Sequence, residues 1–209
     1  VTMNYDLVPR RYRVTDEQID DGDIQSVITP LWWGVSIYDG ETEMYDALEQ
    51  FTEPQKYVWA VQWYYSDVEN GGHEQFFMNY AGIVWEIALE GLRVMRCDIM
   101  TEILEEAIQR IGGYPSFDRE QRWHQMQRHN VDFDDLDREF YDYDRRLEES
   151  IADYIRANRE AFHFDGDVMV PEDMAMQEDD LFIPGFSGFS GGMYSDRRSM
   201  PADYNDYDE

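Results

Sequence analysis

The chain has 209 residues, enough for one medium-sized domain with a substantial hydrophobic core. Its 46 acidic residues against 17 basic ones give a net charge of −29, which disfavours nucleic acid and anionic membranes as partners and favours basic proteins. No signal peptide or membrane-spanning run is visible, and a single cysteine, Cys97, rules out an intramolecular disulfide framework, so we expect a cytoplasmic protein.

The composition has a second explanation, which the sequence leaves open. Lys56 is the only lysine, beside 16 arginines, and acid-rich, lysine-poor chains also arise by adaptation to high salt. Under that explanation the charge is a property of the whole proteome and carries no information about function.

The first 22 residues are polar and predict an irregular N-terminal arm. Its basic cluster, Arg10, Arg11 and Arg13, is expected to pair with the chain's own acidic surface. From residue 23 to residue 162 the apolar spacing is helical, so we predict a single all-α domain. It begins with a helix over 23–37, which contains a proline, and a short amphipathic helix over 41–51.

A nearly all-apolar helix follows from residue 54, and we expect the domain to be organised around it. Thr52 is placed to cap its N-terminus. The sequence Asn-Gly-Gly at 70–72 accepts left-handed backbone angles and predicts a chain reversal. A second short helix, 74–78, would then pack Phe76 and Phe77 back onto the first, giving a buried aromatic helical hairpin.

The segment ENGGHEQFFMNYAG, residues 69–82, resembles part of a bacterial DNA-mimic protein family, an all-α domain catalogued as of unknown function. One member of this family occupies the DNA-binding face of a transcription factor. The likeness extends over about 23–162, and Asn-Gly-Gly is its specific part. We expect a structural role at the reversal for the motif residues Asn70, Gly71, Gly72, Gln75, Asn79 and Gly82.

Three further helices are predicted. One covers 81–95, with Asn79 as its cap, and the next runs from Asp98 to a Gly-Gly stop at 112–113. The last covers 134–162, either as one long helix or as two that join near Tyr143. No stretch alternates as a strand. Residues 163–209 predict an acidic tail that contains glycine, serine and phenylalanine and has no core of its own.

Ten acids fall within the 22 residues from 132 to 153. As a helix, this segment is about 33 Å long and has about one acid per 3.3 Å, close to the spacing of about 3.4 Å between phosphates of one DNA strand. Three arginines, at 138, 145 and 146, reduce its net charge to −7. A solvated helix face is the ordinary explanation; the alternative is a partner-binding surface made of Asp132, Asp134, Asp135, Asp137, Glu139, Asp142, Asp144, Glu148, Glu149 and Asp153.

Signals for catalysis are weak throughout the chain. His124 and His129 are five residues apart, so they do not share a helical face, and no carboxylate is placed to complete a metal site. Nucleophile motifs and phosphate-binding loops are absent from the sequence. We therefore predict no catalytic residue, no metal and no cofactor.

These observations predict a non-enzymatic acidic protein that mimics DNA and blocks the basic face of a DNA-binding protein, such as a transcription factor. Two alternatives stay open: an immunity-type inhibitor of a basic toxin, and a small-molecule enzyme or sensor with a pocket near Asn70, Gln75 and Asn79. Direct binding of nucleic acid or membrane is not expected. The sequence is compatible with a homodimer.

Overall fold

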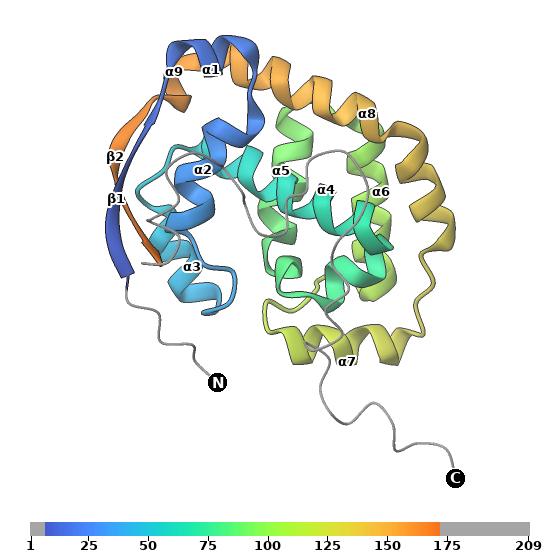
Figure 1. Cartoon of the computed structure of the whole chain (residues 1–209). Helices are drawn as coiled ribbons and strands as arrows, with labels where there is room; N and C mark the ends of the chain where they lie inside the picture. Colours follow the sequence, from blue (N-terminus) through green and yellow to red (C-terminus); the bar gives the residue numbers. More distant parts are fainter. Residues whose placement is uncertain (1–6, 172–209) are drawn as a thin grey trace. The chain divides into compact units, whose positions relative to one another are not determined.

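The computed structural model describes residues 7–171, apart from the side chains of Asp144, Arg145 and Pro171. Within this range the predicted all-α fold is confirmed, with one small two-stranded sheet added (Figure 1). The helices are α1 Asp16–Asp21, α2 Ile24–Gly34, α3 Glu41–Leu48, α4 Glu53–Met78, the 3-10 helix η1 Tyr80–Val84, α5 Trp85–Val94, α6 Asp98–Ile111, α7 Arg119–His129, α8 Asp134–Ala157 and α9 Arg159–Phe162.

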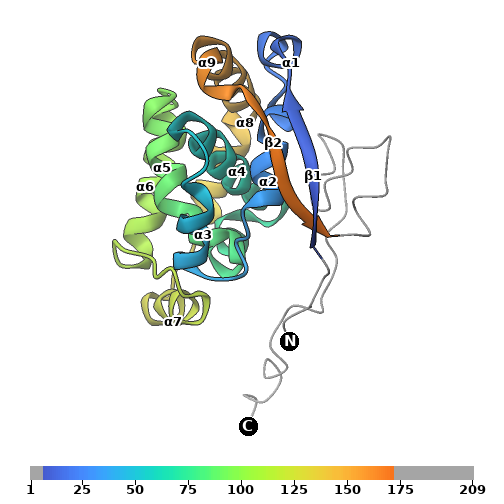
Figure 2. The ribbon, with the colours of Figure 1, turned by 90° about the vertical axis from the view of Figure 1, so that its left-hand side faces the viewer.

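The sheet joins the two ends of the described chain. Strand β1, Leu7–Val14, pairs antiparallel with β2, Phe164–Pro171, and both lie outside the helical body next to α2 (Figure 2). The predictions of an irregular arm over 1–22 and of no strand are therefore wrong from residue 7 onward. The alternation was hidden because the covered side of β1 is formed by half-buried residues, Arg10 and Tyr12 among them, rather than by fully buried apolar ones.

Of two expectations for these ends of the chain, one is confirmed and one is wrong. Arg11 forms an ion pair of 2.8 Å with Asp165 on β2, as expected for a basic cluster that pairs with the chain's own acids. Strand β2 lies inside the segment predicted to be a tail without a core, and its Val168 and Val170 are buried. The rest of that predicted tail lies outside the described residues.

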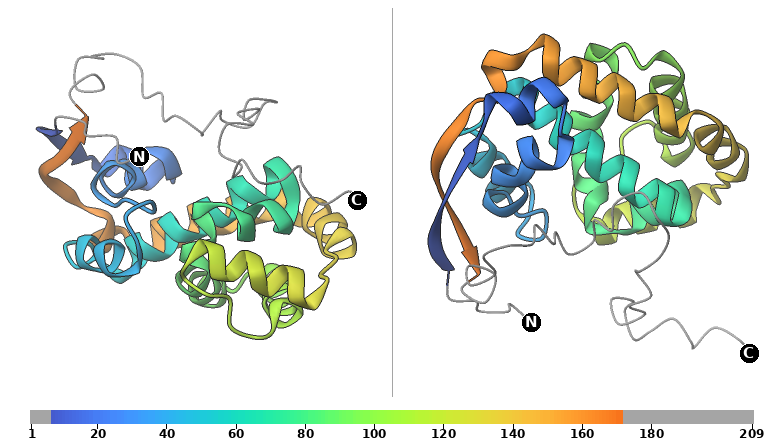
Figure 3. Two further views of the ribbon diagram at one scale, coloured as in Figure 1. Left: turned by 90° about the horizontal axis from the view of Figure 1, so that it is seen from below. Right: turned by 45° about the horizontal axis from the view of Figure 1, so that its top comes forward.

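Helix α4 is the centre of the fold, as predicted. Thr52 caps it with a reciprocal capping box, and α2, α5 and α8 pack around it (Figure 3). The reversal appears as a kink at Gly71 and Gly72, after which Phe76 packs edge-on against Tyr64. Only Gly72 has a left-handed φ, +75°, since Gly71 is extended with φ −164°.

The later helices refine the predicted boundaries. Asn79 directly precedes η1 rather than α5, and its side chain forms no capping hydrogen bond at the start of either helix. Helix α6 ends at Gly112 in the left-handed conformation, as predicted. Helix α8 runs unbroken through Tyr143, so the alternative of one long helix is correct, and a break follows only at Asn158.

Candidate partner-binding surface

Helix α8 is fixed to the body by one apolar row. Leu136, Phe140, Leu147, Ile151 and Ile155 are all buried, and they follow the helical repeat. The predicted acids lie on the remaining faces of the helix or just before it. Exposed among them are Asp132, Asp134, Asp135, Glu139, Asp142, Glu149 and Asp153; Asp137 and Glu148 are half-buried, and the side chain of Asp144 lies outside the description.

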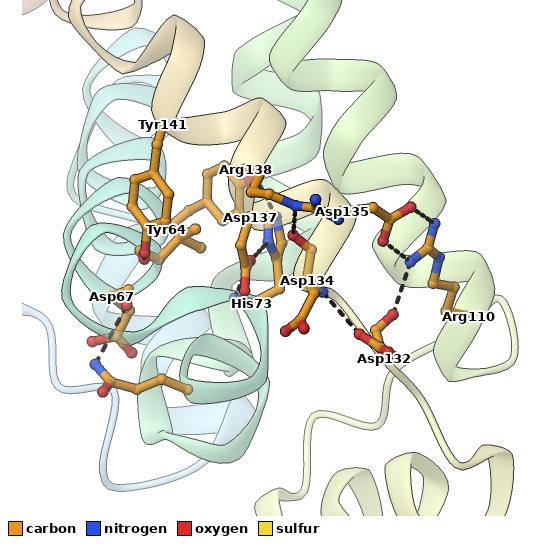
Figure 4. A network of polar contacts seen from close by, with 12 residues as sticks. Tyr64, Asp67, His73, Arg110, Asp132, Asp134, Asp135, Asp137, Arg138 and Tyr141 are labelled. Atoms are coloured by element: carbon orange, nitrogen blue, oxygen red, sulfur yellow. Dashed lines mark hydrogen bonds and ion pairs between the residues drawn. The ribbon is translucent and has the colours of Figure 1, made fainter.

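Asp135 is held by an arginine from the neighbouring helix α6 (Figure 4). The guanidinium of Arg110 donates to both of its carboxylate oxygens, at 2.6 and 2.8 Å, and also to the carbonyl of Asp132 at 2.8 Å. Its Nε donates to Glu106 at 3.0 Å. These hydrogen bonds hold the pKa of the Asp135 carboxyl well below its usual value. Arg110 therefore joins the acids of α6 to those of α8, which the sequence could not place side by side.

Asp137 faces inward, toward the kink of α4 (Figure 4). Its Oδ1 accepts the backbone N–H of His73 at 2.9 Å and lies 2.5 Å from the Nδ1 of the same residue. Burial raises the pKa of Asp137, yet the hydrogen bonds from His73 outweigh burial, so the pKa lies below its usual value. On its other side the fully buried His73 ring meets the hydroxyl of Tyr64, 2.9 Å from Nε2.

Gly72 makes this arrangement sterically feasible. Its left-handed φ turns the chain so that His73 points at α8, and a Cβ at this position would clash with the Asp137 carboxylate. The glycine is thus required twice, once for its backbone angle and once for space.

Two amides of the motif hold Asp67, one through its backbone carbonyl and one through its carboxylate. Gln75 Nε2 donates to the backbone carbonyl of Asp67, and Asn79 Nδ2 donates to its side chain, both at 3.3 Å. Burial raises the pKa of Asp67 to about 7, against the smaller effect of the hydrogen bonds from these two amides. Asn70 itself is exposed. Gln75 and Asn79 therefore bind the two arms of the kink together.

A buried arginine binds the C-terminal end of α4, and no local sequence pattern predicted it. Arg122, on the polar helix α7, is fully buried and donates to the carbonyls of Phe77, Asn79 and Ser116 at 2.6–2.7 Å. Burial lowers its pKa to about 10. A Cβ at Gly82 would stand 2.7 Å from its Nε, which explains the glycine there. These groups satisfy carbonyls left open at the helix end.

A family model described as "DMP19-like protein" matches residues 49–158, more than half of the chain. The chain belongs to the DMP19-like family. The matched segment is narrower than the expected 23–162, and it contains α4 from Glu53 on, the Arg110 ion pairs and all of α8. That the Asn-Gly-Gly stretch is the specific part of the likeness stays a prediction. No curated protein and no solved structure matches the chain.

The described part of this DMP19-like chain offers neither a metal site nor a membrane-spanning helix. Residues 7–171 contain no group of three or more His, Cys, Asp or Glu side chains that could hold a metal ion. Among the helices described, none combines the length and apolar character needed to cross a membrane.

Proposed function

We propose that this protein is a non-enzymatic DNA mimic that blocks the basic face of a DNA-binding protein, such as a transcription factor, in the cytoplasm. The observation that carries the proposal is the anchoring of α8. Its apolar row fixes the helix on the body, so its carboxylates are presented on a rigid support rather than on a free chain. The DMP19-like family membership supports the same function.

The structure places seven of the ten predicted acids in two groups. Asp135, Asp137 and Asp153 are engaged within the protein, by Arg110, His73 and Arg156 respectively. Asp134, Glu139, Asp142 and Glu149 are exposed and form no ion pair among the described residues. We call these four the α8 acidic face, and we infer that they supply most of the attraction to a partner.

The mechanism is competition for the same cationic groups. Arginines and lysines that contact DNA phosphates would pair with the α8 acidic face instead, and the complex would exclude DNA. Because exposed charges are screened over about 8 Å at physiological ionic strength, the affinity should fall steeply as salt is added.

The first experiment identifies the partner and tests competition together. The immobilised protein is used to capture binding proteins from an extract of its native source, and the column is then eluted with duplex DNA. The proposal expects a basic, DNA-binding protein in the DNA eluate, and less of it when the extract is loaded at high salt. If a captured protein binds no DNA, or DNA fails to displace it, the proposal is wrong.

This experiment also separates the alternatives. A captured basic toxin would favour the immunity-type inhibitor, which would use the same acidic face. The second alternative, a small-molecule enzyme or sensor near Asn70, Gln75 and Asn79, is not supported by the geometry. The side-chain amides of Gln75 and Asn79 both donate hydrogen bonds to Asp67.

A further inference from the structure

Arg146 interrupts the row of outward-facing acids on helix α8. It follows Asp142 by four residues and precedes Glu149 by three, so it occupies a position at which the helical repeat of the acids would place another carboxylate. Along the helix axis it lies about 6 Å beyond Asp142 and about 4.5 Å before Glu149. The α8 acidic face is therefore divided in its middle by a cation.

The guanidinium of Arg146 is not paired with these acids, although both are within reach on the helix surface. It lies over the ring of Tyr143, 5.2 Å from the ring centroid, and forms no ion pair among the described residues. Tyr143 is half-buried and packs against the core, so its ring is a fixed support. A cation–π contact at an exposed site stabilises at least as much as an ion pair between residues four apart on a helix, which explains why the ring prevails.

A cation at this position has consequences for the choice of partner. DNA phosphates carry only negative charge, so Arg146 is not needed for charge mimicry. It repels an arginine or lysine that a partner places opposite it, and it favours a partner that has a carboxylate there. The planar guanidinium has five N–H donors and matches a carboxylate, which it can bind by two parallel hydrogen bonds.

The DNA-binding face of a protein can supply such a carboxylate. Aspartate and glutamate read cytosine by accepting a hydrogen bond from its N4, so they occur among the cations that contact phosphates. We propose that Arg146 is a specificity-determining residue, which binds a base-reading carboxylate of the partner while the α8 acidic face binds the surrounding cations. This inference rests on the proposed function, because it takes the partner to be a DNA-binding protein.

The test uses two synthetic peptides that differ in one charge. One is the fluorescein-labelled peptide Arg-Arg-Gly-Glu-Gly-Arg-Arg, and the other has Gln in place of Glu. The dissociation constants of both are measured by fluorescence anisotropy at one ionic strength, for the wild type and for Arg146→Gln. The control variant Arg13→Gln makes the same charge change on β1, at another exposed arginine that forms no ion pair within the described part of the chain.

The deciding quantity is the dissociation constant of the Gln peptide divided by that of the Glu peptide. We expect Arg146→Gln to lower this ratio about two- to fivefold, as for the loss of one exposed ion pair, and Arg13→Gln to leave it unchanged. An unchanged ratio in Arg146→Gln, or an equal decrease in both variants, would overturn the inference. No DNA-binding protein is used, so failure here leaves the proposed function untouched, and failure to capture such a protein leaves this result untouched.

Discussion

His73 and Asp137 are 64 positions apart in the chain, and they are joined twice, through the backbone N–H and the ring Nδ1 of the histidine to one carboxylate oxygen. The contact ties the kink of α4 to the first turns of α8. The segment that contains Asn-Gly-Gly and the candidate partner-binding helix α8 are therefore parts of one structural unit. His73 and Asp137 position α8, and under the proposed function the exposed acids beyond them contact the partner.

Removing the carboxylate of Asp137 should destabilise the fold. Asp137→Ala leaves the fully buried His73 with unpaired donors, and we expect a loss of about 1–3 kcal/mol in the free energy of unfolding, measured by urea denaturation. The control is Glu139→Ala, an exposed acid on the same helix, which should change stability by less than about 0.5 kcal/mol. Equal losses for the two variants would remove Asp137 from this structural role.

The two glycines of the kink should differ. Gly72→Ala forces a side chain into left-handed backbone and against Asp137, so we expect a loss of more than about 2 kcal/mol. At Gly71 the φ angle is extended, and an added Cβ would meet mainly the flexible end of the Gln75 side chain. Gly71→Ala should therefore lower the free energy of unfolding by less than Gly72→Ala does. A lower melting temperature for the Gly71 variant than for the Gly72 variant would contradict this account of the kink.

Asp67 predicts a pH dependence of stability. Its pKa in the folded protein, about 7, is above the value of about 4 expected in the unfolded chain, so the folded state binds more protons between these pH values. The contribution of this group to stability is therefore fully present below about pH 4 and is lost as the pH rises toward 7.

The variant Asp67→Asn isolates this effect, because asparagine keeps an oxygen for Asn79 and cannot ionise. Relative to the wild type, its free energy of unfolding should rise by more than about 1 kcal/mol between pH 4 and pH 8. Urea denaturation at several pH values measures the difference. Parallel pH profiles for the two proteins would show that Asp67 ionises normally in the fold.

Much of the fold could be predicted because its signals are local. The apolar row of α8 and the capping box at Thr52 are both visible within a few residues of sequence. The pairing of β1 with β2 joins distant segments, and the burial of Arg122 depends on carbonyls of another helix. Neither contact leaves a pattern in the local sequence, which is why both were missed.

The sequence predicted which acids belong to the candidate surface, but not which of them are paired within the protein. The acid-rich segment is helical, as expected, yet spacing alone could not show which acids are engaged internally. Asp135 falls on the same outward stripe as Glu139 and Asp142, but Arg110 from α6 pairs with it. Such pairing is decided by tertiary contacts, so only the structure separates exposed acids from engaged ones.

The most direct test of the DNA-mimic account compares two variants of equal net charge. One neutralises the α8 acidic face, Asp134→Asn, Glu139→Gln, Asp142→Asn and Glu149→Gln. The other neutralises four exposed acids on or next to α3, Glu41→Gln, Glu43→Gln, Asp46→Asn and Glu49→Gln. Each is titrated with the purified DNA-binding partner at one ionic strength, after circular dichroism has shown an unchanged helical fold.

The account predicts a loss in affinity of about tenfold or more for the α8 variant, since several exposed ion pairs of a few tenths to 1 kcal/mol each are removed together. The α3 variant should bind nearly as well as the wild type. Equal losses for the two would mean that the partner responds only to total charge, and would contradict a patterned DNA mimic on α8.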